Sequence, residues 1–112
     1  MYLVTAVLKP HRLEEVTSAL KELDVSGLTI SEVQGFGRQR GHTEVYRGSE
    51  YKVDYVPKVR VDIVCDAADA DKVAEVIAES ARTGKIGDGK IWITELARLT
   101  RIRTGESGAD AL

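Results

Sequence analysis

Two glycine-rich segments of this chain combine close backbone approach with positive charge. Residues 35–41 read Gly-Phe-Gly-Arg-Gln-Arg-Gly, and residues 83–90 read Thr-Gly-Lys-Ile-Gly-Asp-Gly-Lys. Glycines let main-chain N–H groups approach a ligand, and the interspersed Arg and Lys side chains supply positive charge where a phosphate would lie. We therefore interpret both segments as parts of a site for a small anion.

Further cations lie where they could contact the same anion. Lys58 begins a predicted strand and lies on the same face of that strand as Arg60 and Asp62. Arg101 and Arg103 alternate in an extended segment, which puts both guanidiniums on one side. Each feature is equally compatible with an ordinary surface, where a lysine packs its apolar stem on a strand and arginines are solvated.

The segment 83–90 has the spacing of a phosphate-binding P-loop but not its context. It fits G-x-x-x-x-G-K, yet Ile91 stands where the Mg²⁺-binding Ser or Thr would follow. It also follows a predicted helix and precedes a strand, which is the reverse of a P-loop. Gly35-x-Gly37-x-x-x-Gly41 has one residue too many for a dinucleotide fingerprint. The anion site must have another architecture, and the alternative for 83–90 is a flexible connection.

Other site chemistry finds little support in the sequence. His11 and His42 have no Cys, Asp or Glu at metal-ligand spacing, so we expect no zinc site. No Ser/His/Asp arrangement and no placed pair of carboxylates is evident, so we expect no catalytic residues and no enzyme. The single cysteine, Cys65, lies in an apolar run and is interpreted as a small buried side chain.

Length and composition predict one domain over residues 1–112. The formal net charge of −2 argues against general nucleic-acid binding, which normally requires a basic domain. The start of the chain has no basic region of a signal peptide, and no apolar run approaches the length of a bilayer span. We expect a cytoplasmic protein.

The periodicity of apolar residues predicts two strand–helix–strand units. Asp69 is the predicted N-cap of the second helix, and Gly27 is expected just past the end of the first. The predicted elements are strand 2–9, helix 12–24, strand 28–34, strand 58–65, helix 69–82 and strand 90–96. Such a split β-α-β repeat builds an α+β fold, a four-stranded antiparallel sheet with both helices on one face.

Two regions lie outside this scaffold. Residues 37–55, a long loop after the second strand, have neither helical nor strand period, and an unstructured loop of that length is usually functional. Residues 102–112 form a C-terminal loop and tail that we expect to be mobile. The first strand is apolar on both faces, so a second subunit should cover the face without helices. We expect a homo-oligomer.

Four stretches of the sequence resemble the PII nitrogen-regulatory signal-transduction family. They are residues 35–39, 46–51, 83–93 and 100–105, and the resemblance extends over essentially the whole chain. It implies a homotrimer of ferredoxin-like subunits that senses ATP, ADP and 2-oxoglutarate and acts through the loop 37–55. The implied targets are ammonium transporters, nucleotidyltransferases and metabolic enzymes, with membrane contact only through a transporter; the sequence does not choose among them.

The same resemblance implies a nucleotide site between neighbouring subunits, with the loop 82–90 holding phosphates. Position 62 is commonly Glu in the family and is Asp62 here, which keeps the charge and shortens the reach. The nucleotide-binding residues implied are Thr29, Gly37, Arg38, Gln39, Asp62, Val64, Gly87, Asp88, Gly89, Lys90, Arg101 and Arg103.

For the second ligand, the resemblance implies that Mg²⁺ is held by the ATP phosphates and Gln39, and that 2-oxoglutarate completes the coordination. Lys58 then pairs with the distal carboxylate of 2-oxoglutarate, while amides near Gly37, Gly41 and Gly87 assist. An oxygen-rich shell of this kind suits Mg²⁺.

Resemblance also makes Tyr51 a candidate for nucleotidylation, with phosphorylation of Ser49 as the alternative. Either modification adds negative charge to the loop and would block a close protein contact. Two other functions remain open at this point: a small nucleotide-hydrolysing enzyme built on the same phosphate loop, and a structural trimer without ligands.

Overall fold

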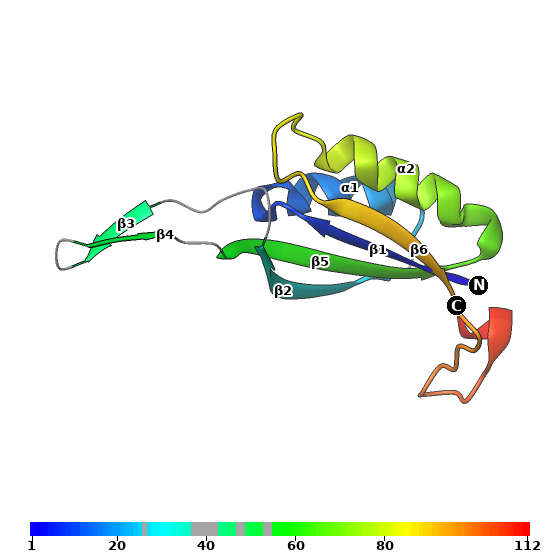
Figure 1. Cartoon of the computed structure of the whole chain (residues 1–112). Coiled ribbons are helices and arrows are strands. Elements are labelled where there is room, and N and C mark those ends of the chain that lie inside the picture. Colours follow the sequence, from blue (N-terminus) through cyan, green and yellow to red (C-terminus); the bar gives the residue numbers. More distant parts are fainter. Residues whose placement is uncertain (26, 37–42, 47–48, 53–54) are drawn as a thin grey trace.

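The structure, a computed structural model, describes residues 1–25, 27–36, 43–46, 49–52 and 55–112, with backbone only for 43–46 and 49–52. A four-stranded antiparallel sheet has the order β2-β5-β1-β6. Both helices pack on one face of this sheet, as Figure 1 shows, so the predicted α+β, ferredoxin-like fold is confirmed. The elements are β1 Tyr2–Leu8, α1 Leu13–Glu22, β2 Thr29–Phe36, β5 Tyr55–Cys65, α2 Ala70–Ala81 and β6 Lys90–Glu95.

The core lies between the helices and the two central strands. Alternate residues of a strand share one face, and in α1 and α2 the apolar residues recur at helical spacing. Val4 of β1 pairs with Ile63 of β5, and both side chains are fully buried. The helices contribute Val16, Leu20, Val73, Ile77 and Ala81 to the same core.

The first helix ends two residues earlier than predicted, and Asp24 rather than Gly27 follows it. Asp24 has a positive φ of 63°. Its amide donates to the Lys21 carbonyl at 3.0 Å, and the Val25 amide donates to the Leu20 carbonyl at 3.2 Å. This is the Schellman arrangement, in which one left-handed residue satisfies the last carbonyls of a helix. Asp tolerates that conformation better than most residues, which is why a glycine is not needed.

The second helix begins where predicted, but by a different local structure. Asp69 occupies the N-cap position of α2, yet its side chain makes no capping hydrogen bond. A single 3₁₀ turn, Ala67–Asp69, leads into the helix instead.

Strand structure continues into the predicted long loop. β3 (Thr43–Tyr46) and β4 (Ser49–Lys52) pair as an antiparallel hairpin, with Thr43 opposite Lys52. The prediction that 37–55 lacks strands was wrong, because cross-strand hydrogen bonds supply what the local sequence pattern does not reveal. Residues 37–42, 47–48 and 53–54 lie outside the described part of the chain.

The C-terminal segment, which we expected to be mobile, has local structure of its own. Thr100 and Ser107 form an isolated bridge, and a 3₁₀ turn spans Gly108–Ala111. The segment lies beyond the end of β6 (Figure 1). Among the described residues, no helix is long and apolar enough to cross a membrane.

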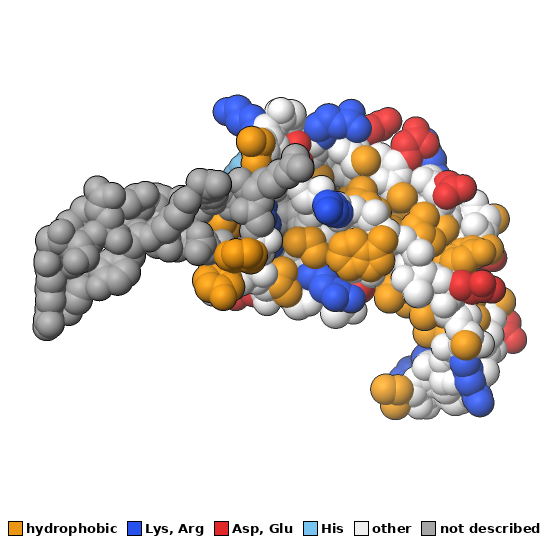
Figure 2. All heavy atoms as spheres, in the orientation of Figure 1, with side chains coloured by type: hydrophobic (Ala, Val, Ile, Leu, Met, Phe, Trp, Pro, Cys, Tyr) orange, Lys and Arg blue, Asp and Glu red, His pale blue; other side chains and the backbone are white. Residues whose placement is uncertain are grey.

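The sheet face opposite the helices carries cations around apolar side chains. Trp92 of β6 is 42% exposed there, and the Arg60 guanidinium lies 5.9 Å from its ring centroid. Figure 2 shows hydrophobic side chains between Lys and Arg side chains on the face that it draws. The expectation that a second subunit covers this face stays a prediction.

Candidate anion-binding site

The connection from α2 to β6 is a tight loop that rests on β1. Gly84, Gly87 and Gly89 all have positive φ, at 82°, 93° and 101°. A Cβ added at Gly89 would come within 1.7 Å of the Val7 carbonyl oxygen. Glycine at position 89 therefore serves two needs, the backbone conformation and the direct contact with β1.

Asp88 holds this loop closed from within. One carboxylate oxygen accepts hydrogen bonds from the amides of Thr83 and Gly84, each at 2.9 Å. The other accepts the Thr83 hydroxyl and lies 3.2 Å from the Lys9 ammonium. These contacts, the Thr83 hydroxyl first, hold the pKa of Asp88 well below its usual range. The Asp88 side chain therefore shapes the loop, and its place among the nucleotide-binding residues stays a prediction.

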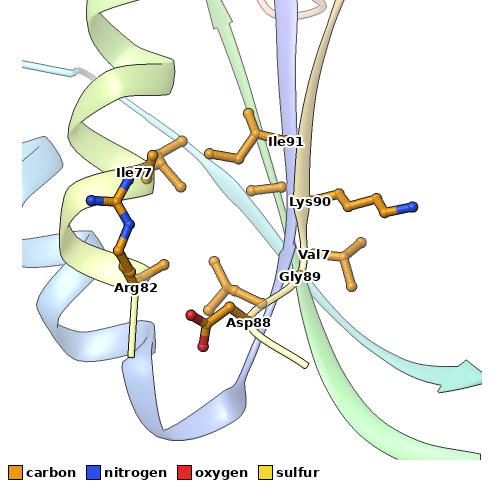
Figure 3. Close-up of a pocket in the computed structure, with 11 residues that line it drawn as sticks. Val7, Ile77, Arg82, Asp88, Gly89, Lys90 and Ile91 are labelled. Carbon is orange, nitrogen blue, oxygen red and sulfur yellow. The ribbon is translucent and has the colours of Figure 1, made fainter. Parts of the chain in front are cut away.

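The two faces of the sheet differ at this loop. Figure 3 shows Ile91 pointing toward Ile77 of α2, while Lys90 points away from the helices. On the helix side the loop borders a pocket of about 220 Å³, whose lining includes the core residues Ala6, Leu8, Ile77 and Ala81. The Lys90 side chain thus lies on the opposite face of the sheet from this pocket.

Lys58 lies on that other side and is nearly buried, at 8% exposure. Its ammonium donates a hydrogen bond to the Gly87 carbonyl, which joins β5 to the loop. Its stem runs past Gly35, where an added Cβ would lie 3.2 Å from the Lys58 Cγ. Burial, followed by the charge of Lys9, lowers the pKa of Lys58. A buried cation beside a loop rich in backbone amides is a chemical arrangement suited to an anion.

A groove of about 660 Å³ runs between β2, β5, β6 and the loop. Phe36, Ile86 and Trp92 give it apolar walls, and Lys58 and Lys90 give it positive charge. The predicted site residues that it brings together are Lys58, Gly87, Asp88, Gly89 and Lys90.

Other predicted residues lie farther along the same sheet face. Thr29 is directly opposite Asp62 in the pairing of β2 with β5, and Val64 follows on that face. The Asp62 carboxylate accepts hydrogen bonds from Arg60 Nε at 2.9 Å and from Thr5 Oγ1 at 2.7 Å. The hydrogen bond from Arg60 is the main cause that lowers the pKa of Asp62. This carboxylate already has partners within its own chain.

The two arginines of the C-terminal segment do not reach the groove in their own chain. Arg101 pairs with Glu106 at 3.5 Å and donates to the Leu112 carbonyl. Arg103 is exposed. Both follow β6, whereas the loop precedes it, so the strand separates them by about 20 Å at 3.3 Å per residue. The predicted residues Gly37, Arg38, Gln39 and Gly41, and the side chains of Ser49 and Tyr51, lie outside the described residues.

Sequence reasoning missed Lys9 as part of the site, and it gave Thr83 no role of its own within the predicted loop 82–90. Lys9 is 9% exposed, and its ammonium donates to the Thr83 hydroxyl at 3.0 Å. The spacing Thr83-Gly84-x-x-x-Asp88 was a usable signal, because Asp and Thr side chains commonly bond to nearby backbone amides in turns. The sequence around Lys9 gives no comparable signal.

Comparison with known proteins places this chain in a family. Residues 1–106 match the family model described as nitrogen regulatory protein P-II. The chain is 51% identical to nitrogen regulatory protein GlnK of Escherichia coli K12 over 112 residues, which is all of both chains. It is 49% identical to nitrogen regulatory protein P-II of Azospirillum brasilense over 109 residues, 97% of each chain.

A solved structure agrees with the sequence comparisons. The crystal structure of Arabidopsis thaliana PII bound to citrate superposes with a TM-score of 0.81 at 37% identity, and covers 99% of this chain and 91% of that one. The names of these relatives describe regulatory signalling proteins of nitrogen metabolism and not enzymes. They confirm the expectation that this protein is a regulator and not an enzyme, and they disfavour the alternative of a nucleotide-hydrolysing enzyme. This chain belongs to the nitrogen regulatory protein P-II family.

Proposed function

We propose that the protein is a cytoplasmic homotrimer that senses ATP or ADP together with 2-oxoglutarate and regulates target proteins through residues 37–55. The observation that carries the proposal is the groove in which buried Lys58 meets the loop 83–89. A buried cation and a main-chain loop set by three glycines with positive φ lie together there, and both suit an anionic ligand.

The trimer explains residues that one chain leaves apart. Arg101 and Arg103 lie at the far end of β6 from the groove. A neighbouring subunit packed on the sheet face without helices would bring its own pair to the phosphates beside Lys90. Thr29, Asp62 and Val64 would then contact the base and ribose of the nucleotide. Arginine suits this role because its planar guanidinium binds phosphate in two places.

Lys58 is the residue that we assign to 2-oxoglutarate. Its ammonium contacts Gly87 and its stem passes Gly35, so a dicarboxylate could pair with Lys58 and accept hydrogen bonds from main-chain amides of the loop and of residues 37–41. The Arabidopsis thaliana relative is described as bound to citrate, which is also a polycarboxylate.

Mg²⁺ fits this site only as a shared ion. No three His, Cys, Asp or Glu side chains within the described ranges could hold a metal together. Oxygens of the ATP phosphates, of 2-oxoglutarate and of the Gln39 side chain would supply the shell, and such ligands suit Mg²⁺. The ion would supply positive charge that joins the two anionic ligands.

Regulation follows from where the long segment is attached. β2 ends at Phe36 and β5 begins at Tyr55, and Phe36 lines the groove. A ligand at Lys58 and Gln39 would therefore fix the attachment of residues 37–55 and decide whether the segment engages a target. Targets would be ammonium transporters, nucleotidyltransferases or metabolic enzymes. Nucleotidylation of Tyr51, or phosphorylation of Ser49, would add a second control.

Calorimetry tests the proposal directly. We expect 2-oxoglutarate to bind in the presence of Mg-ATP and to bind far more weakly without it, because ligands that share an ion must raise each other's affinity equally. Gln39→Ala should abolish 2-oxoglutarate binding and leave ADP binding largely intact. Equal binding of 2-oxoglutarate with and without Mg-ATP would contradict the shared site. A monomer in sedimentation experiments would contradict the trimer.

A further inference from the structure

Lys9 is a buried lysine that neither the sequence patterns nor the proposed ligands require. It follows the end of β1, is 9% exposed, and contacts Thr83 and Asp88 of the loop. Burial of an ammonium is costly unless hydrogen bonds and an opposite charge compensate. Within the described part of the chain, the compensation comes from Thr83 and Asp88, so the loop and Lys9 form one unit.

Lys9 and Lys58 both lie beside the loop that contains Asp88. Lys9 follows the register pair of Leu8 with Val59, which puts it beside Lys58 on the neighbouring strand. The charge of Lys9 acts on Lys58, and so does the opposite charge of Asp88. One carboxylate thus lies within electrostatic reach of two nearly buried ammonium groups.

The hydrogen bonds of Asp88 decide between the two lysines. Two loop amides occupy one of its oxygens, while the Thr83 hydroxyl and the Lys9 ammonium occupy the other. Lys58 instead donates to the Gly87 carbonyl. The loop therefore directs its carboxylate toward Lys9 and a carbonyl toward Lys58.

We propose that Lys9 is a positioning residue of the anion site: it holds Asp88 inside the loop and so prevents this carboxylate from pairing with Lys58 in place of the anionic ligand. The inference rests on the proposed function only in that Lys58 binds an anion. Without Lys9, Asp88 loses the ammonium that holds it, while its charge still acts on Lys58, and the ligand must then displace a carboxylate from its own site.

The test uses the full-length protein and calorimetric titration with 2-oxoglutarate in saturating Mg-ATP. Lys9→Met should weaken 2-oxoglutarate binding by about tenfold or more, because Asp88 then competes for Lys58. Lys9→Arg, which keeps the charge, should bind within about threefold of the wild type. The double variant Lys9→Met/Asp88→Asn should recover most of the affinity, because the competing carboxylate has become a neutral amide of the same shape.

The outcomes separate positioning from mere support of the fold. If Lys9 only supports the loop, the second substitution removes another loop contact and the double variant binds as weakly as Lys9→Met or more weakly, which overturns the inference. Unchanged binding by Lys9→Met overturns it as well. If Lys9→Met does not fold, recovery of folding and binding in the double variant supports the inference, and failure of both to fold overturns it. No 2-oxoglutarate binding by the wild type would refute the proposed function instead.

Discussion

Gly89 lies against β1 so closely that a Cβ at this position would come within 1.7 Å of the Val7 carbonyl oxygen. The contact is between main-chain atoms, and a strand in the centre of the sheet cannot move aside without breaking its pairing on both sides. The position of the whole anion-binding loop therefore depends on the absence of a side chain at residue 89.

Gly89→Ala should destabilise the protein by about 3 kcal/mol, because it adds backbone strain to a clash that cannot relax. Gly84→Ala is the matched control: Gly84 also has positive φ but has open space around its Cβ position. That variant should lose only about 1–2 kcal/mol, the cost of the left-handed conformation. Urea denaturation measures the free energy of unfolding of both variants. Equal losses of stability would show that the contact with Val7 is unimportant.

Asp88 should make the stability of the protein depend on acidity. Its folded pKa is depressed, first by the Thr83 hydroxyl, so its contribution is complete above the ordinary Asp pKa of about 3.9 and is lost as pH falls toward the folded pKa. Asp88→Asn should therefore flatten the loss of stability below about pH 4. Thr83→Val should flatten it partly. Denaturation curves at a series of acidic pH values measure the slope, and identical slopes for Asp88→Asn and the wild type would contradict this role.

Asp24→Gly should stabilise the protein by roughly 0.5–1 kcal/mol. Asp24 holds the left-handed position after α1, where glycine has no steric cost, and part of this gain is offset by the greater freedom of glycine in the unfolded chain. Asp24→Ala removes the same carboxylate but retains the strain, so it should give no gain. Thermal unfolding of both variants tests this prediction. A similar rise in melting temperature for Asp24→Ala would show that loss of the carboxylate charge, and not relief of strain, is the cause.

The buried hydroxyl of Thr5 donates to the Asp62 carboxylate at 2.7 Å. Thr5→Val keeps the shape of the side chain and removes the donor, so it should cost about 1–2 kcal/mol. Thr94 of β6 is exposed, and Thr94→Val should change stability by no more than about 0.5 kcal/mol. Denaturant unfolding compares the two, and a loss at Thr94 as large as that at Thr5 would mean that the hydrogen bond contributes little.

Glu106→Gln should raise the affinity for ATP, if Arg101 binds phosphate as proposed. Glu106 pairs with Arg101 at 3.5 Å, and both side chains are partly exposed, so the gain is limited to about fivefold by the small value of such ion pairs. Glu79→Gln, on the exposed face of α2, changes the net charge equally and should leave ATP binding unaltered. Calorimetry with ATP distinguishes a local effect from one of overall charge, which would appear in both variants.

The arrangement of elements could be predicted because strands and helices repeat with different periods. The alternation from Lys58 to Cys65 and the helical spacing of Val73 and Ile77 each correspond to one buried face in the structure. The contact between Lys58 and Gly87 agrees with what the family resemblance implied, whereas the sequence pattern alone did not connect the two residues.

What could not be predicted depends on contacts between distant parts of the chain. Lys9 has the sequence of a surface lysine, yet it is buried and contacts Thr83 and Asp88, which lie more than 70 residues away in the chain. The end of α1 at Glu22 depends on the positive φ of Asp24, whereas the sequence pattern favours Gly27 for that conformation. The β3–β4 hairpin depends on pairing across four register positions, each of them weak alone.

Gly89, Asp88 and Lys9 hold the loop in place, but Ile86 of the same loop is 70% exposed and lines the groove. Position 86 is accordingly a place for an optical reporter. Ile86→Cys would present a reactive thiol there, while Cys65, buried in the core and with its pKa raised by that burial, would react slowly. A dye attached at this wall would turn the arrival of each metabolite into a change in fluorescence.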